Sequence, residues 1–283
     1  MKRMLLRTFW TVVVLVCVGY GVILWWFSAH ETELVYAPDR QIRPLPEDFP
    51  LKVERVAVRS DDGVNLVGRT YRVVGREDTG MWILYFHGNA GNATRRVRFH
   101  AQLVEMGVSV LVAEYRGYGE SEGTPDEQGV YRDADAFYGY LRDTLGVSPE
   151  RCVIFGSSLG SGVAIDVASR LPAAGLIVEG AFTSISDRGQ ELYPYIPVRW
   201  MARNRFASIE KIGRVTMPKL FIHAADDEII PIAHGRRLFE EAANPKMFLE
   251  VRGDHNMAYE QDSRIFFGGI GIFLGRVRGG SWD

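Results

Sequence analysis

Cysteine is scarce in this sequence of 283 residues, which contains only Cys17 and Cys152. One of them lies in an apolar run near the amino terminus and the other in an expected core strand, so a framework of disulfides is excluded. An excess of charge of one sign is lacking too, because 33 basic and 35 acidic residues leave a formal net charge of −2. That balance does not indicate a nucleic-acid partner. Internal repeats and low-complexity segments are also absent from the sequence.

Long apolar runs are scarce as well, and the single one, at residues 8–27, excludes a transporter with many membrane-spanning helices. It holds about 20 uncharged residues, enough to cross roughly 30 Å of hydrocarbon. Trp10 lies near one end and Trp25, Trp26 and Phe27 lie at the other, which is typical of interfacial anchors. We therefore predict one transmembrane helix, with residues 1–29 as a membrane anchor.

Charges on either side of the apolar run predict its orientation. Three basic residues precede it and two acidic residues follow it: Lys2, Arg3 and Arg7, then Glu31 and Glu33. The positive-inside rule places the amino terminus in the cytoplasm and the rest of the chain across the membrane, which in a bacterium is the periplasmic side of the inner membrane. A cleaved signal peptide is the alternative, although Phe27-Ser28-Ala29 is a poor cleavage site.

The rest of the chain divides into a connector and one domain. Residues 30–50 carry four prolines and few apolar residues, which predicts an extended connector. From residue 51 to 283, short apolar segments alternate with helical patterns. Strands are expected at 51–60, 64–73, 82–86, 108–113, 151–155, 175–178, 220–223 and 247–251, and helices at 94–106, 126–145, 161–171, 233–243 and 263–277. This alternation predicts an α/β fold with a mostly parallel sheet between helices, and an antiparallel hairpin at one edge.

One segment, at about residues 182–217, interrupts the alternation with helical pieces and no strand. We interpret it as a short cap inserted over the active site. Its apolar side chains suggest an acyl pocket, for which the candidates are Tyr193, Tyr195, Trp200 and Met201. The alternative is that these side chains only pack the insertion onto the sheet.

The strongest chemical signal is Gly156-Ser157-Ser158-Leu159-Gly160, which lies between an expected strand and an expected helix. This layout is typical of a nucleophile elbow, where Ser158 occupies a tight and strained turn. Bulky residues two positions away would clash, which explains the two glycines. The turn also directs the backbone N–H of Leu159, at a helix start, toward the same space. A serine in a glycine-rich turn without catalytic function is the alternative.

A nucleophilic serine needs a base and an acid. Among six histidines, His255 is the best candidate for the base, because it follows the last strand and therefore lies at the carboxyl edge of the sheet. His100 and His234 occupy helical segments and are expected to be solvated. The acid is expected in Asp226-Asp227-Glu228, directly after strand 220–223. The order serine, acid, histidine is that of α/β-hydrolases.

Acyl transfer also needs two N–H donors for the oxyanion. Leu159 is expected to supply one of them. The loop after strand 82–86, His87-Gly88-Asn89-Ala90-Gly91-Asn92, has the small residues that allow a close backbone approach. We expect the second donor to be the N–H of Asn89, with Ala90 as the alternative. A phosphate-binding loop is disfavoured because the Walker pattern and its lysine are absent.

These motifs together resemble the α/β-hydrolase superfamily over about residues 50–275. The chain is similar, more narrowly, to a membrane-anchored branch with an HGNAGN oxyanion loop, described as serine aminopeptidase-like or abhydrolase-domain proteins. In that branch the acid is the aspartate of a D-x-x-(V/I)-P pattern, which falls on Asp227 rather than Asp226. The resemblance implies the α/β-hydrolase fold and a single amino-terminal anchor. Animal members of the branch include protein depalmitoylases.

The sequence therefore predicts a membrane-anchored serine hydrolase that cleaves carboxylic esters or thioesters with an acyl chain. Ser158 is the expected nucleophile, His255 the base and Asp227 its partner, with Leu159 and Asn89 as oxyanion donors. No metal and no cofactor are expected. One alternative is an aminopeptidase-like amide hydrolase, with an acid such as Glu179 or Glu191 holding a free amino terminus. The other is a silent binding module tethered to the membrane.

Overall fold

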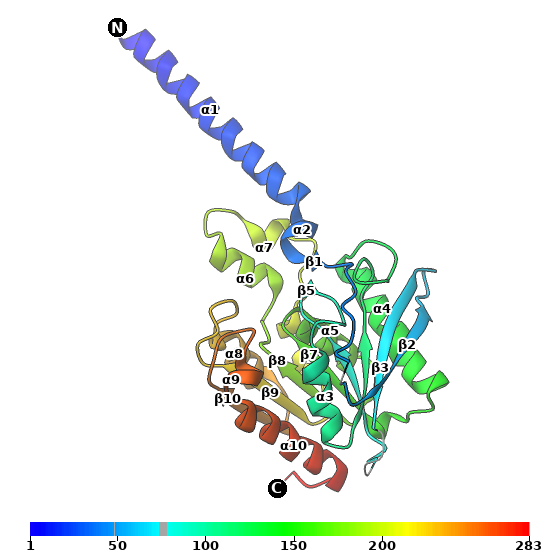
Figure 1. The fold of residues 1–283 in the computed structure, drawn as a ribbon. Helices are drawn as coiled ribbons and strands as arrows, with labels where there is room; N and C mark the ends of the chain where they lie inside the picture. Colours follow the sequence, from blue (N-terminus) through cyan, green and yellow to red (C-terminus); the bar gives the residue numbers. More distant parts are fainter. Residues whose placement is uncertain (48, 74–77, 283) are drawn as a thin grey trace.

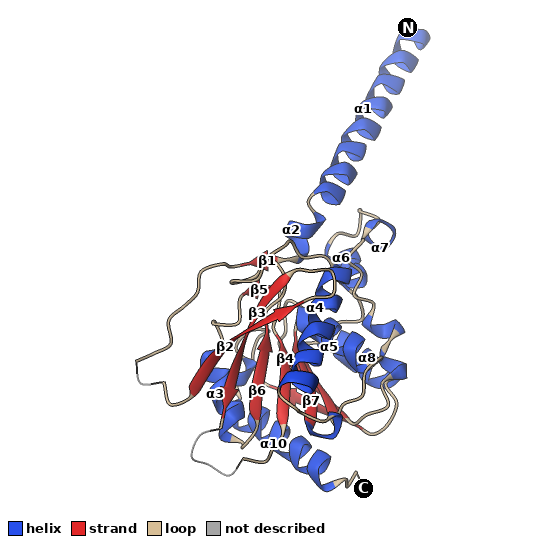
Figure 2. Cartoon of the chain, turned by 90° about the vertical axis from the view of Figure 1, so that its right-hand side faces the viewer, coloured by secondary structure: helices blue, strands red, loops and turns tan. Residues whose placement is uncertain are grey.

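The structure, a computed structural model, describes residues 1–47, 49–73 and 78–282. One sheet with the strand order β10-β9-β8-β7-β4-β6-β3-β2 organises the globular part (Figure 2). Its strands are β2 (Lys52–Arg59), β3 (Asn65–Arg72), β4 (Trp82–Phe86), β6 (Ser109–Ala113), β7 (Cys152–Ser157), β8 (Gly175–Glu179), β9 (Lys219–Ala224) and β10 (Lys246–Val251). Neighbours from β10 to β6 are parallel, whereas β3 runs antiparallel to both β6 and β2.

The central strands are the most apolar because they are covered on both faces. Every residue of β6, β7 and β8 is buried. Alternate residues of β4 point to opposite sides, so Leu84 and Phe86 join one core while Ile83 and Tyr85 join the other. The expected strands are thus confirmed to within a few residues, including the antiparallel hairpin at the edge.

Helices form a layer on each face of the sheet (Figures 1 and 2). One face carries α3 (Val97–Glu105) and α10 (Ser263–Gly279). The other carries α4 (Glu127–Gly139), α5 (Leu159–Ala168) and α8 (Ile232–Glu241). A short α9 (Ala258–Gln261) precedes α10. α4 begins where Asp126 caps the backbone N–H of Gly129, and a π-helical turn at Tyr140–Thr144 extends it.

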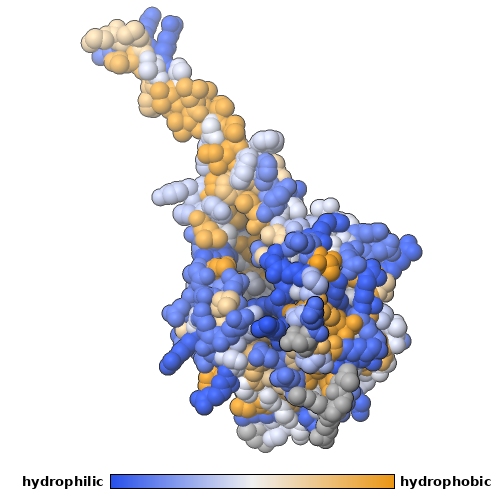
Figure 3. All heavy atoms as spheres, in the orientation of Figure 1, coloured by the Kyte–Doolittle hydropathy of each residue, from blue (hydrophilic) through white to orange (hydrophobic). Residues whose placement is uncertain are grey.

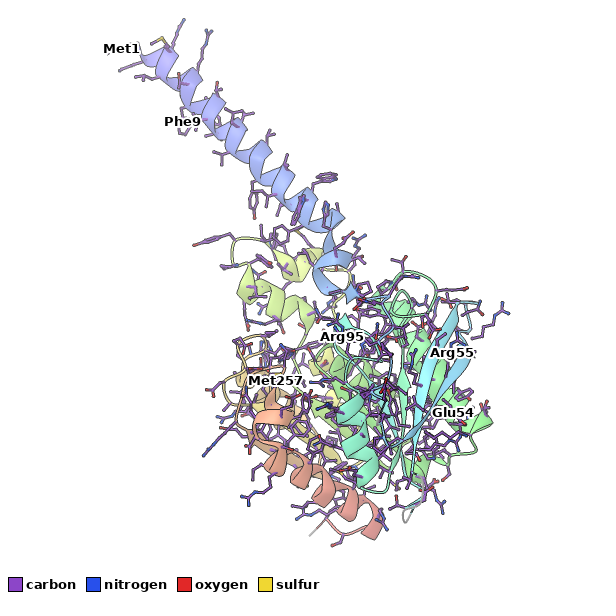
Figure 4. The ribbon with its side chains drawn as sticks, in the orientation of Figure 1. Met1, Phe9, Glu54, Arg55, Arg95 and Met257 are labelled. Atoms are coloured by element: carbon purple, nitrogen blue, oxygen red, sulfur yellow. The ribbon has the colours of Figure 1, made fainter. Side chains whose placement is uncertain are left out.

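Helix α1 (Lys2–Ala29) projects away from the globular part and has no buried residue. Figure 4 shows Met1 and Phe9 on the portion that stands clear of the domain. In the part of the chain that the structure describes, α1 is the one helix long and apolar enough to cross a membrane. It includes the predicted run at 8–27 and continues beyond it at both ends.

The segment expected as an extended connector makes specific contacts with the domain. Glu31–Val35 forms the short helix α2, and β1 (Ala37–Pro38) pairs in parallel with β5 (Ala90–Gly91). The side chain of Tyr36 is buried, and its hydroxyl donates to Asn204 Oδ1 at 2.9 Å. The expectation of an extended connector was therefore wrong for residues 31–38. Only a few side chains bind this segment to the domain, so its sequence shows no apolar periodicity.

The cap consists of α6 (Ile185–Leu192), α7 (Val198–Met201) and two 3-10 turns at Ser208–Glu210 and Ile212–Arg214. α6 and α7 lie beside α2, at the foot of α1 (Figure 1). No strand occurs between residues 182 and 217, all of which the structure describes. The cap therefore lies next to the segment that joins α1 to the domain.

Candidate active site

The expected elbow is present between β7 and α5. Ser158 has a φ of 52°, and in the described ranges only Phe206 is another non-glycine residue with a positive φ. A Cβ atom on Gly156 would overlap the carbonyl oxygen of Gly160, and one on Gly160 would overlap the carbonyl oxygen of Phe86. Both glycines are therefore required by the close approach of backbone around the serine.

Three residues distant in sequence meet above this turn. His255 Nε2 lies 2.9 Å from Ser158 Oγ, and His255 Nδ1 lies 2.6 Å from Asp227 Oδ2. A carboxylate can only accept hydrogen bonds, so Nδ1 carries the imidazole proton and Nε2 accepts from the serine hydroxyl. Because Asp227 and His255 are almost fully buried, solvent competes little for these bonds.

Asp227 is held from several directions. Its Oδ1 accepts the backbone N–H groups of Ile229 and Ile230 at 3.0 and 2.7 Å. Its Oδ2 also lies 3.5 Å from His223 Nε2. Burial alone would raise the pKa of Asp227, but the hydrogen bonds from His223 and His255 lower it well below its ordinary value. Asp226 is exposed, so the geometry selects Asp227 of the two aspartates.

The loop after β4 passes directly over the serine. A Cβ on Gly88 would lie 3.4 Å from Ser158 Cβ. The carbonyl of Asn89 accepts from Tyr118 Oη at 2.7 Å and from the N–H of Ala37 at 3.0 Å, which holds the loop. Leu159 is the first residue of α5, as expected. The two residues predicted as oxyanion donors therefore flank Ser158 on adjoining segments.

A buried ion pair behind the elbow was missed in the sequence. Arg96 Nη1 donates to Ser157 Oγ at 3.0 Å, to Tyr85 Oη at 3.0 Å and to Glu179 Oε2 at 3.1 Å. The carbonyl of Glu179 in turn accepts the N–H of Ser158 at 2.8 Å. The one available signal was a glutamate at the end of the apolar strand β8, since no motif includes Arg96.

Two histidines expected to be solvated are buried instead. His100 is 1% exposed and packs against the rings of Tyr71 and Tyr85. Burial lowers its pKa to about 3, so its ring is neutral. His234 is also buried, with Nδ1 2.9 Å from Thr183 Oγ1. The expectation failed because both residues lie on the inward faces of their helices.

A cavity of about 710 Å³ lies above Ser158. It is lined by residues around the elbow (His87, Gly88, Asn89, Ser158, Leu159, His255), of the cap (Ile185, Leu192, Tyr193, Ile196, Val198, Met201) and of the amino-terminal segment (Phe27, Leu34, Val35), among others. Its size falls in the range of sites for small molecules, and most of its cap residues are apolar, although Arg188 also lines it.

Two of the four residues predicted for the substrate pocket lie outside this cavity. Tyr193 and Met201 line it, but Tyr195 and Trp200 do not. These two residues are 87% and 91% exposed and line a separate, open hollow beside Tyr20. The turn between α6 and α7 directs Ile196 inward and Tyr195 outward, an alternation that aromatic composition alone does not reveal.

The acids suggested for binding a free amino terminus are already paired. Glu179 contacts Arg96, and Glu191 contacts Arg188 at 3.1 Å. Glu31 is the acidic residue among those that line the cavity, and it accepts from Arg203 Nε at 3.0 Å. No group of His, Cys, Asp and Glu suited to a metal ion occurs within residues 1–47, 49–73 and 78–282.

Comparisons with known proteins agree with this fold. The family model described as serine aminopeptidase, S33, matches residues 79–209. An uncharacterized protein of Mycobacterium tuberculosis is 34% identical over 93% of both chains. The alpha/beta hydrolase domain-containing protein WAV2 of Arabidopsis thaliana is 30% identical, covering 77% of this chain and 78% of its own. The chain therefore belongs to the α/β-hydrolase superfamily.

Two further relatives bear names that describe an activity. The lysophosphatidylserine lipase ABHD12 of Danio rerio is 36% identical over 184 residues, which are 58% of this chain and 48% of that protein. The Pyrococcus furiosus esterase Pf2001 matches with a TM-score of 0.70 and 19% identity, over 85% of this chain and 98% of its own. At that identity the second match shows the fold alone.

Proposed function

We propose that this protein is a membrane-anchored serine hydrolase that cleaves carboxylic esters or thioesters with an acyl chain. The observation that carries the proposal is His255, placed between Ser158 Oγ and Asp227 Oδ2 on the floor of a largely apolar cavity. Such an arrangement activates a serine hydroxyl for attack on an acyl carbonyl.

The reaction proceeds in two halves. Ser158 Oγ attacks the acyl carbonyl while His255 Nε2 accepts its proton, and Asp227 stabilises the imidazolium. The N–H groups of Leu159 and Asn89 stabilise the oxyanion. The leaving alcohol or thiol takes the proton from His255. Water then attacks the acyl-enzyme with His255 as its base, which releases the acid and restores Ser158.

The lowered pKa of Asp227 keeps this carboxylate ionised across the working pH range. His255 Nε2 must carry no proton in order to accept the one from the serine hydroxyl. No metal or cofactor takes part in these steps.

Ester or thioester cleavage is preferred to amide cleavage because of the cavity. Its cap side is built from apolar residues such as Leu192, Ile196 and Met201. A free amino terminus would need an unpaired acid, whereas Glu31, Glu179 and Glu191 each contact an arginine. The lipase name of one relative supports the same choice. Aminopeptidase-like amide hydrolysis, to which the family description refers, remains the competing activity.

Helix α1 supports the membrane part of the proposal, because it is apolar over residues 8–27 and none of its residues is buried in the domain. The charges on either side of it favour a cytoplasmic amino terminus with the catalytic domain across the membrane. A silent binding module is disfavoured, since a module without catalysis would not require the strained Ser158 and its aligned partners.

Labelling of the full chain with a fluorophosphonate probe tests the proposal. We expect Ser158→Ala to abolish labelling and Ser161→Ala to preserve it, because Ser161 is buried and makes no side-chain hydrogen bond in the described structure. Hydrolysis of acyl esters beside aminoacyl amides then separates the two activities. Equal labelling of wild type and Ser158→Ala, or hydrolysis of the amides alone, contradicts the proposal.

A further inference from the structure

The cavity opens at the foot of the amino-terminal helix. Phe27 of α1 and Leu34 and Val35 of α2 form one part of its wall, and Leu192 and Tyr193 of the cap form another. The rings of Phe27 and Tyr193 meet edge to face, with centroids 4.9 Å apart. An acyl chain that enters between these two walls therefore comes from the end of the domain that carries α1 (Figure 1).

The turn of the cap lies beside α1 itself. Tyr20 Oη donates a hydrogen bond of 2.6 Å to the carbonyl of Tyr195. Tyr20 belongs to the apolar run at 8–27, and along an α-helix it lies about 10 Å from Phe27. If α1 spans a bilayer, the cap residues next to Tyr20 reach the outer layer of that bilayer. We name residues 193–200 the cap tip.

The composition of the cap tip suits such a position. Trp200 and Tyr195 are 91% and 87% exposed, and Leu192 next to the tip is 55% exposed. Arg199 is the one charged residue of the cap tip, and it pairs with Asp187 at 2.8 Å. Tryptophan and tyrosine are enriched at membrane interfaces because their rings are apolar and carry a polar group. In Figure 3 the apolar side chains of α1 continue down to where the helix meets the globular part.

Polar contacts hold the foot of α1 and the cap together. Glu31 is buried and accepts hydrogen bonds from the backbone N–H groups of Arg203 and Asn204 at 2.8 and 2.7 Å. Asn204 also accepts from the hydroxyl of Tyr36. The orientation of the cap tip relative to α1 is therefore set by directional bonds between the two segments.

We propose that the cap tip is a second membrane-contacting element, and that the substrate is an acyl amphiphile resident in the bilayer. Its chain passes from the lipid along the wall that Phe27 and Tyr193 form and into the cavity above Ser158. The inference rests on the proposed function, since it names the substrate phase and the entry route of the same site. The exposed side chains of Tyr195 and Trp200 contact lipid, which is continuous with the lipid around α1.

A labelling experiment tests the membrane contact without any activity. In the full chain with Cys17→Ser and Trp200→Cys, an environment-sensitive fluorophore is attached to the new thiol at position 200. The remaining Cys152 is buried and should not react. The labelled protein is placed in nanodiscs of phosphatidylcholine, with one protein in each disc. We expect blue-shifted emission that spin-labelled lipids quench. Ile272→Cys is the control, because Ile272 is 57% exposed on α10 at the opposite end from α1. Equal, water-like emission at both sites overturns the proposal, as does emission that depends on a second copy of the chain.

A second experiment tests the entry route. The variant Tyr195→Ser with Trp200→Ser is compared with wild type on a long-chain ester dissolved in the bilayer and on a water-soluble butyrate ester. We expect turnover of the bilayer ester to fall about tenfold, because less apolar surface is buried in the interface, and turnover of the soluble ester to stay unchanged. Ile272→Ser should change neither turnover. Unchanged turnover of both esters in the double variant overturns the entry route alone. Failure of the wild type on both esters contradicts the proposed function instead, and the fluorophore still reports the membrane contact.

Discussion

The floor and the cap face the same cavity but are built differently. At the floor, Ser158, Asp227 and His255 follow β7, β9 and β10, and parallel strands bring these ends together at one edge of the sheet. The cap has no strand, and its turn exposes Tyr195 and Trp200. From this difference we expect bond cleavage to depend on groups held by the sheet, and the choice of substrate to depend on an insertion held by a few side-chain contacts.

The largest effect is expected from breaking the floor at Asp227. Asp227→Asn keeps the shape but removes the charge and favours the wrong imidazole tautomer, so kcat should fall about 10⁴-fold. Asp226→Asn is the matched control and should retain activity within about twofold, because Asp226 is exposed. Ester hydrolysis by both variants is the measurement, and similar losses in the two would contradict the assignment of the acid.

The stability of the fold at low pH provides a second test of the role of Asp227. The folded pKa of Asp227 is depressed, so its ionised form contributes stability above the unfolded pKa of about 3.9. This contribution is lost as the pH falls through the lower folded pKa. Unfolding followed against pH should therefore show a steeper acid limb for wild type than for Asp227→Asn.

The turn around the serine should be the next most sensitive feature. A methyl group on Gly160 would overlap backbone atoms of β4, so Gly160→Ala should lower the free energy of unfolding by about 3 kcal/mol and displace Ser158. Gly271→Ala is the matched control, since nothing lies within 4 Å of the added Cβ on α10. It should be neutral or stabilise the helix by up to about 1 kcal/mol. Thermal unfolding with probe labelling measures both effects.

A smaller loss of activity is expected from substitution of Arg96, which supports the floor. Arg96→Lys loses the bonds by which one guanidinium nitrogen joins Ser157, Tyr85 and Glu179, so kcat should fall about tenfold while KM stays nearly constant. Arg95→Lys is the control on the neighbouring residue, whose guanidinium pairs with Asp39 instead. A change in KM with an unaltered kcat would indicate that Arg96 contacts substrate rather than positioning the elbow.

The smallest effect should come from the wall of the cap, and it separates the two regions most clearly. Ile196→Ala removes part of the apolar wall and so enlarges the cavity. The preference for long over short acyl chains should therefore change by about threefold to tenfold, with kcat for short chains retained. Tyr195→Ala should leave this preference for water-soluble esters unchanged, because Tyr195 lies outside the cavity. A chain-length series of soluble esters measures the difference. Identical profiles for the two variants would show that the cap does not select the chain.

The features that follow local rules could be predicted from the sequence. Apolar runs and turn residues were sufficient to predict the strands, the helices and the antiparallel edge. The tight turn at Ser158 requires glycine at two fixed positions, so five residues are enough to identify the elbow in the sequence. The candidate residues that follow the strands could be chosen because all parallel strands end at the same edge.

The features that depend on which distant surfaces meet could not be predicted from the sequence. The pairing of Arg96 with Glu179, the contacts of Glu31 with the cap and the burial of His100 join segments that share no motif. The outward direction of Tyr195 and Trp200 was equally hidden, because an aromatic side chain has the same sequence signature whether it packs inward or outward. The physical reason is that backbone geometry repeats over a few residues, whereas burial and charge pairing are set by the whole fold.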